Sequence, residues 1–285
     1  MKTLVKYCVL PAMLAALAPL AFADGFVIYN TLPSPLPPNM VSVNYEADEA
    51  AEFGGLIQFA GGGSNYSLIN ATVGMSDWAY ASEWQKSGSF DCPAGSNCTS
   101  SGFTVPLTLN LYNVGANNSV GSLIAAESVD AFIPWRPEPT AGCGSNYLGS
   151  DGNCHGGSLS TVTFNFTDVT VPGEIIWGLS FNTTNYGVNP TGVLGPYDSL
   201  NIAMAQTLPT TGSNPLPDTV YWNTLYAPYY ADGGAGGTGT FRQDTGWYPQ
   251  SGAIEFTSSP EPSSLLLLGS GLLGLAGMLR RKLSA

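Results

Sequence analysis

The sequence predicts an all-β protein that folds as a two-sheet antiparallel sandwich of the jelly-roll type. Short runs of β-branched and aromatic residues recur along the chain, and turn-forming residues, among them 35 glycines and 21 prolines, separate them. Several runs alternate apolar and polar residues, as a strand with one buried face requires. Outside the two ends of the chain, no window repeats apolar residues at helical spacing.

Residues 1–23 have the features of a secretory signal peptide. Lys2 and Lys6 precede an apolar run rich in alanine and leucine, which closes on Ala21-Phe22-Ala23. A charged start, an apolar stretch and small residues at a cleavage site are typical of such peptides. We therefore expect cleavage after Ala23, with Ala21 and Ala23 as the cleavage-site residues, and export of the rest of the chain.

Residues 24–257 are expected to form one β-sandwich domain, because single all-β domains commonly reach this length. The stretch TLPSPLPPN at 31–39 contains four prolines and is expected to be extended and irregular. Leucines alternate with polar residues in 107–112, and the more continuously apolar 175–181 predicts a central strand with Trp177 in the core. The predicted strands are 26–29, 41–45, 55–59, 68–75, 104–114, 121–133, 158–170, 175–182, 200–205, 219–226 and 253–257.

The charge of the body excludes one class of partner. Without the two ends, three basic residues (Lys86, Arg136 and Arg242) and nineteen acidic residues remain, which gives a net charge of −16. A chain this acidic repels phosphate backbones, so we expect no nucleic-acid partner. The acidic cluster Glu46, Asp48, Glu49 and Glu52 is expected to be a solvated loop or strand end, with a cation site as the alternative.

Four cysteines remain after removal of the signal peptide: Cys92, Cys98, Cys143 and Cys154. An even number in an exported chain indicates disulfides. Pairing of sequence neighbours is suggested, but three pairings are open. A zinc site that includes His155 is the alternative, although no C-x-x-C spacing is present.

Aromatic residues give the clearest hint of a ligand. Several lie in segments that are expected to be loops or strand edges, next to Asn, Asp and Gly. Flat rings in such settings can stack on sugars while amides and carboxylates bind the hydroxyls. The candidates for glycan stacking are Trp84, Trp135, Trp247 and Tyr248; Trp78 and Tyr80 belong to the same group. The alternative for each ring is packing in the core.

No catalytic residues are predicted. The single histidine, His155, adjoins Cys154, and neighbouring side chains of an extended segment point to opposite faces, which disfavours a dyad. A glycosidase needs two carboxyls across a cleft, and Glu127, Glu174 and Glu255 lie in or beside predicted strands, but no pair stands out. We expect no metal site and no cofactor, with calcium at Asp151–Asn153 or Asp232–Gly234 as a minor alternative to turns.

The last 28 residues, 258–285, have three parts. The triplet Pro260-Glu261-Pro262 opens the segment, an uncharged Leu/Gly run follows over Leu265–Leu279, and Arg280, Arg281 and Lys282 follow the run. At about 1.5 Å per residue the run forms a hydrophobic helix of roughly 22 Å, short for a permanent span of a bilayer core of about 30 Å. The basic residues would stay on the cytoplasmic side, so the triplet faces outward.

These three parts, in this order, resemble the PEP-CTERM sorting signal of Gram-negative bacteria. The resemblance covers only the tail. It implies recognition by an exosortase, a membrane-embedded cysteine transpeptidase, followed by removal of the tail and export toward the outer surface, often beside exopolysaccharide production.

The body has a looser resemblance. The blocks 107–114, 133–137, 171–178 and 198–201 are similar to blocks in secreted bacterial proteins without an assigned activity, which implies an all-β fold and no mechanism. We therefore expect an exported, non-catalytic surface or matrix protein that associates with polysaccharide and touches the membrane only through its tail before processing. The alternatives are a secreted glycan-active hydrolase with paired carboxylates and a structural or adhesive surface protein.

Overall fold

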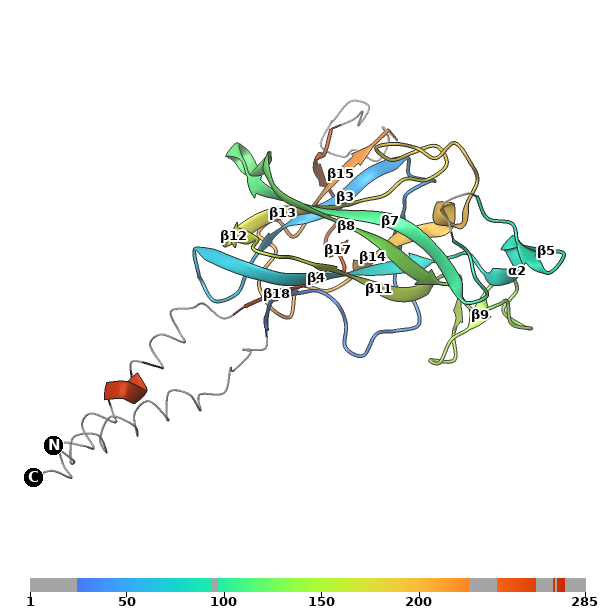
Figure 1. Ribbon diagram of the computed structural model, residues 1–285, viewed down its shortest axis with the longest axis horizontal. Coiled ribbons are helices and arrows are strands. Elements are labelled where there is room, and N and C mark those ends of the chain that lie inside the picture. Colours follow the sequence, from blue (N-terminus) through green and yellow to red (C-terminus); the bar gives the residue numbers. More distant parts are fainter. Residues whose placement is uncertain (1–24, 94–96, 226–239, 260–268, 270, 275–285) are drawn as a thin grey trace, which may run out of the picture. The chain divides into compact units, whose positions relative to one another are not determined.

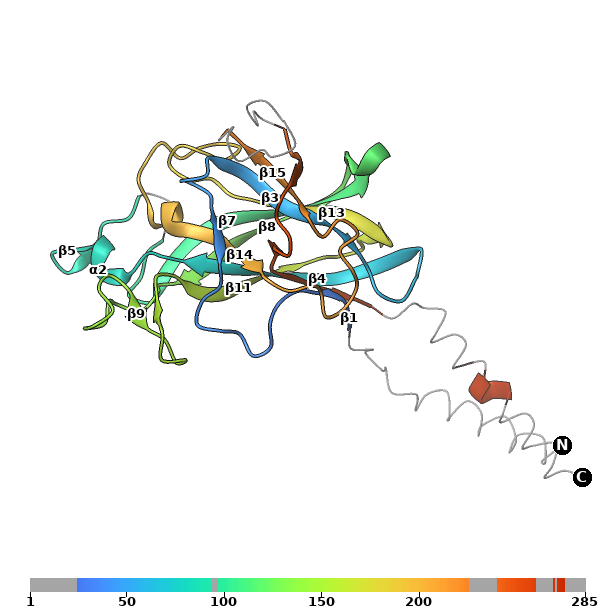
Figure 2. The same cartoon turned by 180° about the vertical axis from the view of Figure 1, so that it is seen from behind.

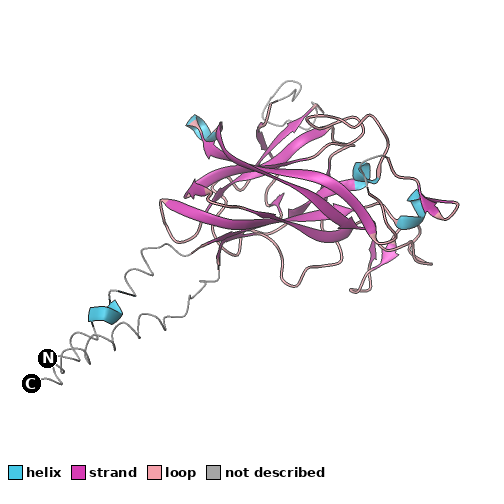
Figure 3. Ribbon diagram, viewed as in Figure 1, coloured by secondary structure: helices cyan, strands magenta, loops and turns pink. Residues whose placement is uncertain are grey.

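A computed structural model shows an almost entirely β fold (Figures 1 and 3). It describes residues 25–93, 97–225, 240–259, 269 and 271–274. Val27–Ser258 form one compact unit, the body. In the other unit, Gly269 and residues 271–274 are helical.

The body contains an eight-stranded and a six-stranded sheet, with antiparallel strand pairs in both. The larger sheet comprises β1 (Phe26–Asn30), β2 (Ser42–Asn44), β4 (Asn65–Asp77), β11 (Ser158–Asn165), β12 (Thr170–Pro172), β14 (Leu200–Ala205), β17 (Ser251–Gly252) and β18 (Ile254–Ser258). The smaller sheet comprises β3 (Ala50–Gln58), β7 (Gly102–Val114), β8 (Val120–Pro134), β13 (Glu174–Ser180), β15 (Thr219–Thr224) and β16 (Arg242–Thr245). The prediction of an all-β, two-sheet antiparallel sandwich is confirmed, and the jelly-roll connectivity stays a prediction.

Short elements occupy the connections between the strands. Two hairpins, β5–β6 (Gln85–Lys86, Ser89–Phe90) and β9–β10 (Tyr147–Leu148, Cys154–His155), stand outside the main sheets. The helical pieces are α2 (Ala81–Trp84), η1 (Ala116–Asn118) and η2 (Pro196–Ser199).

Alternation along the strands builds the core between the two sheets. Leu107, Leu109 and Leu111 of β7 are fully buried, while the intervening Thr108 and Asn110 face outward and are partly exposed. Trp177 of β13 is 1 % exposed, as its apolar surroundings in the sequence predicted. These inward side chains belong to one continuous apolar cluster that draws on both sheets.

The strand predictions differ from the structure in two informative places. Residues 158–170 were predicted as one strand but form the end-to-end strands β11 and β12, because Asp168 has a positive φ of 56° between them. Strand β3 begins five residues earlier than predicted, and it includes Gly54. A Cβ on Gly54 would lie 1.8 Å from the Trp177 carbonyl oxygen, so glycine permits close approach of β3 and β13.

The acidic cluster near the start of β3 is split between different partners. Glu46 binds the Asn185 side chain and Asp48 accepts from the Asn44 amide, 3.0 Å away. Glu52 is only 8 % exposed, so the expectation that it is solvated is wrong. Its carboxylate accepts hydrogen bonds from Asn110 Nδ2 and Tyr112 Oη, both at 2.9 Å, and burial raises its pKa.

A Glu52→Gln variant is expected to be more stable than the native protein at pH 7. The raised pKa means that the folded state prefers the protonated carboxyl, so stability is lost as pH rises from the unfolded pKa through the folded one. Glutamine keeps one oxygen that can accept both hydrogen bonds. Urea denaturation at pH 4 and pH 7 should show that the advantage of the variant grows with pH. An advantage independent of pH would contradict this account.

Candidate binding pocket at the end of strand β4

A hollow with a volume of about 780 Å³ lies where β4 ends. The proline-rich segment 31–41 crosses the outer face of the larger sheet here, and Figure 2 shows it as the blue loop that leaves β1 and returns toward β14. The lining contains amides, hydroxyls, apolar side chains and one histidine, but no Asp, Glu, Lys or Arg: Thr31, Pro33, Pro37, Asn39, Met40, Val41, Ser42, Asn44, Trp78, His155, Asn201, Met204, Ala205, Gln206 and Thr207.

Hydrogen bonds fasten the proline-rich segment to the strands beneath it. The Thr31 hydroxyl bonds the Gly252 and Ile254 carbonyls at 3.0 and 3.1 Å. At the other end of the segment, the Met204 N–H donates to the Val41 carbonyl at 2.7 Å. The wall of the pocket is therefore held at both ends, although the segment has no strand structure of its own.

Trp78, the first residue after β4, presents an aromatic surface to the pocket. Its side chain is 45 % exposed. The indole Nε1 donates to Ser76 Oγ at 3.1 Å, and that hydroxyl donates to Asn39 Oδ1 at 2.7 Å. A Cβ on Gly156 or Gly157 would come within 2.6 Å of the indole, so these glycines let the chain pass against the ring. The ring is thus fixed before any ligand arrives.

A buried amide lies beside this ring. Asn201 of β14 is 1 % exposed, and its side chain lies 3.2 Å from the Ser42 hydroxyl. When the amide is oriented to satisfy its neighbours, its oxygen also accepts from the Trp78 indole at 3.1 Å. Asn44 pairs with Asn201 across β2 and β14, so two amides face the same pocket.

A buried arginine supports the backbone of Trp78. Arg136 is 5 % exposed; its Nε donates to the Trp78 carbonyl at 2.7 Å, and its guanidinium carbon lies 4.4 Å from the centre of the Tyr80 ring. Asp77, fully buried, accepts from the Ala79 and Arg136 N–H groups at 3.1 and 3.3 Å. Burial raises the pKa of Asp77 well above its usual range.

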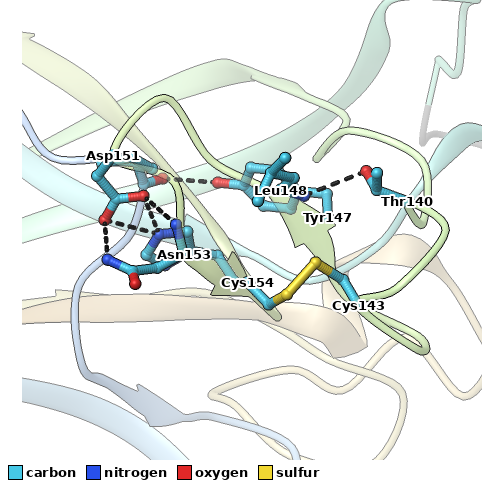
Figure 4. Close-up of polar contacts among 9 residues, drawn as sticks. Thr140, Cys143, Tyr147, Leu148, Asp151, Asn153 and Cys154 are labelled. Atoms are coloured by element: carbon cyan, nitrogen blue, oxygen red, sulfur yellow. Dashed lines mark hydrogen bonds and ion pairs between the residues drawn. A yellow bond between two sulfur atoms is a disulfide. The ribbon is translucent and has the colours of Figure 1, made fainter.

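The hairpin β9–β10 is closed by the Cys143–Cys154 disulfide (Figure 4), and it contributes one residue to the lining of the pocket. His155 lines the pocket, and its Nε2 lies 2.9 Å from Asp151 Oδ1. This contact and the hydrogen bonds from Asn153 lower the pKa of Asp151 to about 2. The Tyr147 hydroxyl donates to the Pro38 carbonyl at 2.9 Å, which ties the hairpin to the proline-rich segment.

A second hollow, of about 610 Å³, lies on the other side of Ser199. Its lining includes the Lys86–Asp91 ion pair and the exposed apolar Val193 and Leu194. The full lining is Glu83, Trp84, Lys86, Asp91, Cys92, Pro93, Val193, Leu194 and Ser199.

Residues 260–282 match the family model described as the PEP-CTERM protein-sorting motif. The chain carries a PEP-CTERM sorting motif. This motif supports an exported protein that an exosortase sorts through a membrane-anchored tail. No curated protein and no solved structure matches the chain, so the looser resemblance of the body stays a prediction.

The residues named for the sorting motif and for the predicted signal peptide lie outside the described residues. This applies to Ala21, Ala23, Pro260, Glu261, Pro262, Arg280, Arg281 and Lys282. Within the described part of the chain, no helix has the length and apolar character needed to cross a membrane. The family match therefore rests on the sequence of the tail.

The four aromatic residues predicted to stack on glycans lie in separate surroundings. Trp84 lines the second hollow. Trp135 donates to the Thr99 carbonyl and packs against Phe90 and Phe103, whereas Trp247 packs edge-on against Phe53 and Trp222. Tyr248 is 63 % exposed. They do not form one platform, and Trp78, which the sequence analysis placed in the same group, lies at the larger pocket.

The remaining candidate sites are placed as follows. Cys92 bonds Cys98 and Cys143 bonds Cys154, the pairing of sequence neighbours. Among the described residues, no group of three His, Cys, Asp or Glu side chains could hold a metal ion. Glu127, Glu174 and Glu255 belong to three different strands, β8, β13 and β18. Asp232–Gly234 lies outside the described residues.

Removal of the hairpin disulfide by a Cys143→Ser, Cys154→Ser double variant should cost about 2–3 kcal/mol, because the unfolded chain regains the entropy of the closed loop. Urea denaturation of the oxidised proteins measures this loss. The matched Cys92→Ser, Cys98→Ser variant removes the shorter loop and should cost slightly less. Non-reducing peptide mapping that recovers Cys92 or Cys98 joined to Cys143 or Cys154 would contradict the pairing.

Proposed function

We propose that this protein is a non-catalytic, exported surface or matrix protein whose body binds extracellular polysaccharide through the pocket at Trp78. The observation that carries the proposal is the fixed, exposed indole above a hollow lined by amides and hydroxyls. Aromatic faces stack on the apolar faces of sugar rings, and amides can donate and accept hydrogen bonds with hydroxyl groups.

The charge of the pocket favours an uncharged ligand. None of its lining residues is an acid, a lysine or an arginine, although residues 24–257 carry a net charge of −16. A phosphate or carboxylate ligand would meet no lysine or arginine there and would approach through a repulsive field. Neutral sugars avoid both costs.

The lining of the pocket also supports binding rather than cleavage. Glycoside hydrolysis uses two carboxyls placed on either side of the bond that breaks. The pocket at Trp78 has no carboxylate in its lining, and Asp151, which lies behind His155, is engaged by His155 and Asn153. A bound sugar at this place would therefore be held and released unchanged.

Export and sorting support the proposal, because they would bring the body to the outer surface of the cell. The sorting motif supports delivery through a membrane-anchored tail. We propose that the signal peptide at 1–23 starts this export and that the exosortase removes the segment after the body. The same proposal gives the domain limits, 24–257 for the body and 258–285 for the tail. It also makes Arg280, Arg281 and Lys282 the basic end that halts the tail in the membrane.

Retention on the exopolysaccharide of the host cell tests the binding function. The exported protein should be retained, with no reducing ends released, and Trp78→Ala should weaken retention at least about tenfold, or roughly 1.4 kcal/mol. Phe132→Ala, which removes an aromatic ring that is 51 % exposed on β8, is the matched control and should change nothing. Release of reducing ends would favour the hydrolase, and no retention would favour a structural or adhesive protein.

Replacement of Pro260, Glu261 and Pro262 by alanine tests the processing step. The variant should keep its full tail and stay in the membrane fraction, because the segment that the exosortase recognises is gone. Intact-mass measurement of the native and variant proteins decides this, with a host that lacks the exosortase as the control. Masses of the two proteins that differ only by the three substitutions in the normal host would contradict processing at this motif.

A further inference from the structure

We propose that the Trp78 pocket and the Trp84 hollow are consecutive subsites of one binding track, so that the ligand is a chain of several sugar residues. This inference rests on the proposed function and deepens it. Either hollow alone has the volume of an ordinary small-ligand site, at about 780 and 610 Å³.

The start of β14 connects the two hollows. Ser199 lines the Trp84 hollow and Asn201 lines the Trp78 pocket. Ser199 is the last residue of η2, Asn201 is the second residue of β14, and the fully buried Leu200 lies between them. Two residues of chain span at most about 7 Å, so the linings of the two hollows approach each other at this point.

A second connection runs along the chain from Trp78 to Trp84. The Trp78 N–H donates to the Ser199 carbonyl at 3.0 Å, so the residue that begins this segment lies directly against the boundary between the hollows. The short helix α2 then carries Trp84, and the Glu83 carboxylate accepts from the Tyr80 N–H at 3.3 Å. The two indoles thus belong to one segment, whose first residue is hydrogen-bonded to Ser199.

The two hollows differ in chemistry in the way that neighbouring subsites for one polymer do. The Trp78 pocket offers neutral amides and hydroxyls. The Trp84 hollow adds the Lys86–Asp91 ion pair and Glu83 to its indole, and the exposed Leu194 supplies an apolar wall. Charged groups make stronger hydrogen bonds to hydroxyls than neutral ones, so the second subsite recognises the polar edge of a sugar residue.

Affinity should rise with the length of the sugar chain. Once one sugar residue occupies the first subsite, a linked residue reaches the second subsite in an intramolecular step. The probe is the exopolysaccharide of the host, partially hydrolysed and fractionated into fragments of one to eight sugar residues. Calorimetry with the exported protein in mild detergent should show affinity that increases at least about 100-fold with length and then levels off.

Variants of the two tryptophans show which subsite contributes to the binding of short and of long fragments. Trp84→Ala should abolish most of the gain with length, whereas Trp78→Ala should weaken the binding of fragments of every length. Trp84→Phe keeps a flat ring and should retain the gain. Phe132→Ala is the control outside the track, and circular dichroism with thermal melting shows that each variant is folded.

The outcomes separate this inference from the function on which it rests. If fragments bind but affinity does not depend on length, or if Trp84→Ala keeps the full gain, the track is refuted and a single-pocket binding protein stands. If neither the fragments nor the intact polymer binds, the proposed function fails and the track fails with it.

Discussion

The hydrogen bonds along both edges of strand β4 are the constraint on which the larger sheet depends. On one edge β11 pairs with residues 70–77 and β12 with residues 65–67. On the other edge β18 pairs with the first half of β4 and β14 with its end. One strand thus orders four others that lie far apart in the sequence. Its last residues set the positions of Trp78 and Asn201. The geometry of the pocket therefore depends on this strand.

Much of the fold could be predicted because alternation is a local property. In β7, β11 and β18, apolar side chains at every second position mark the buried face, and those strands occur where the sequence placed them. Strands β16 and β17 were missed, since Arg242–Thr245 is polar and Ser251–Gly252 is too short to show a period. Glu52 was misplaced because its burial depends on Asn110 and Tyr112, more than fifty residues away.

The pocket could not be predicted in the same way. Its lining comes from residues 31–44, 78, 155 and 201–207, and no local motif links them. The prolines of the segment 31–41 predicted an irregular connection, and the segment is irregular. Nothing in its sequence indicated that it lines a cavity. The prediction of disulfides between neighbours succeeded because short loops in an exported chain favour them. The prediction that Trp135 and Trp247 stack on glycans shows why other predictions failed. An indole next to polar residues in the sequence can still pack against the core.

The direction of β4 also has a consequence for how the body is displayed. Ser258, the last residue of β18, lies opposite Leu68 near the beginning of β4, whereas Trp78 follows its end. Ten residues of strand separate the two positions, or about 30 Å. The chain therefore leaves the body toward its sorting tail at one end and offers its indole at the other. The indole of Trp78 thus lies a strand's length from Ser258, the last residue of the body.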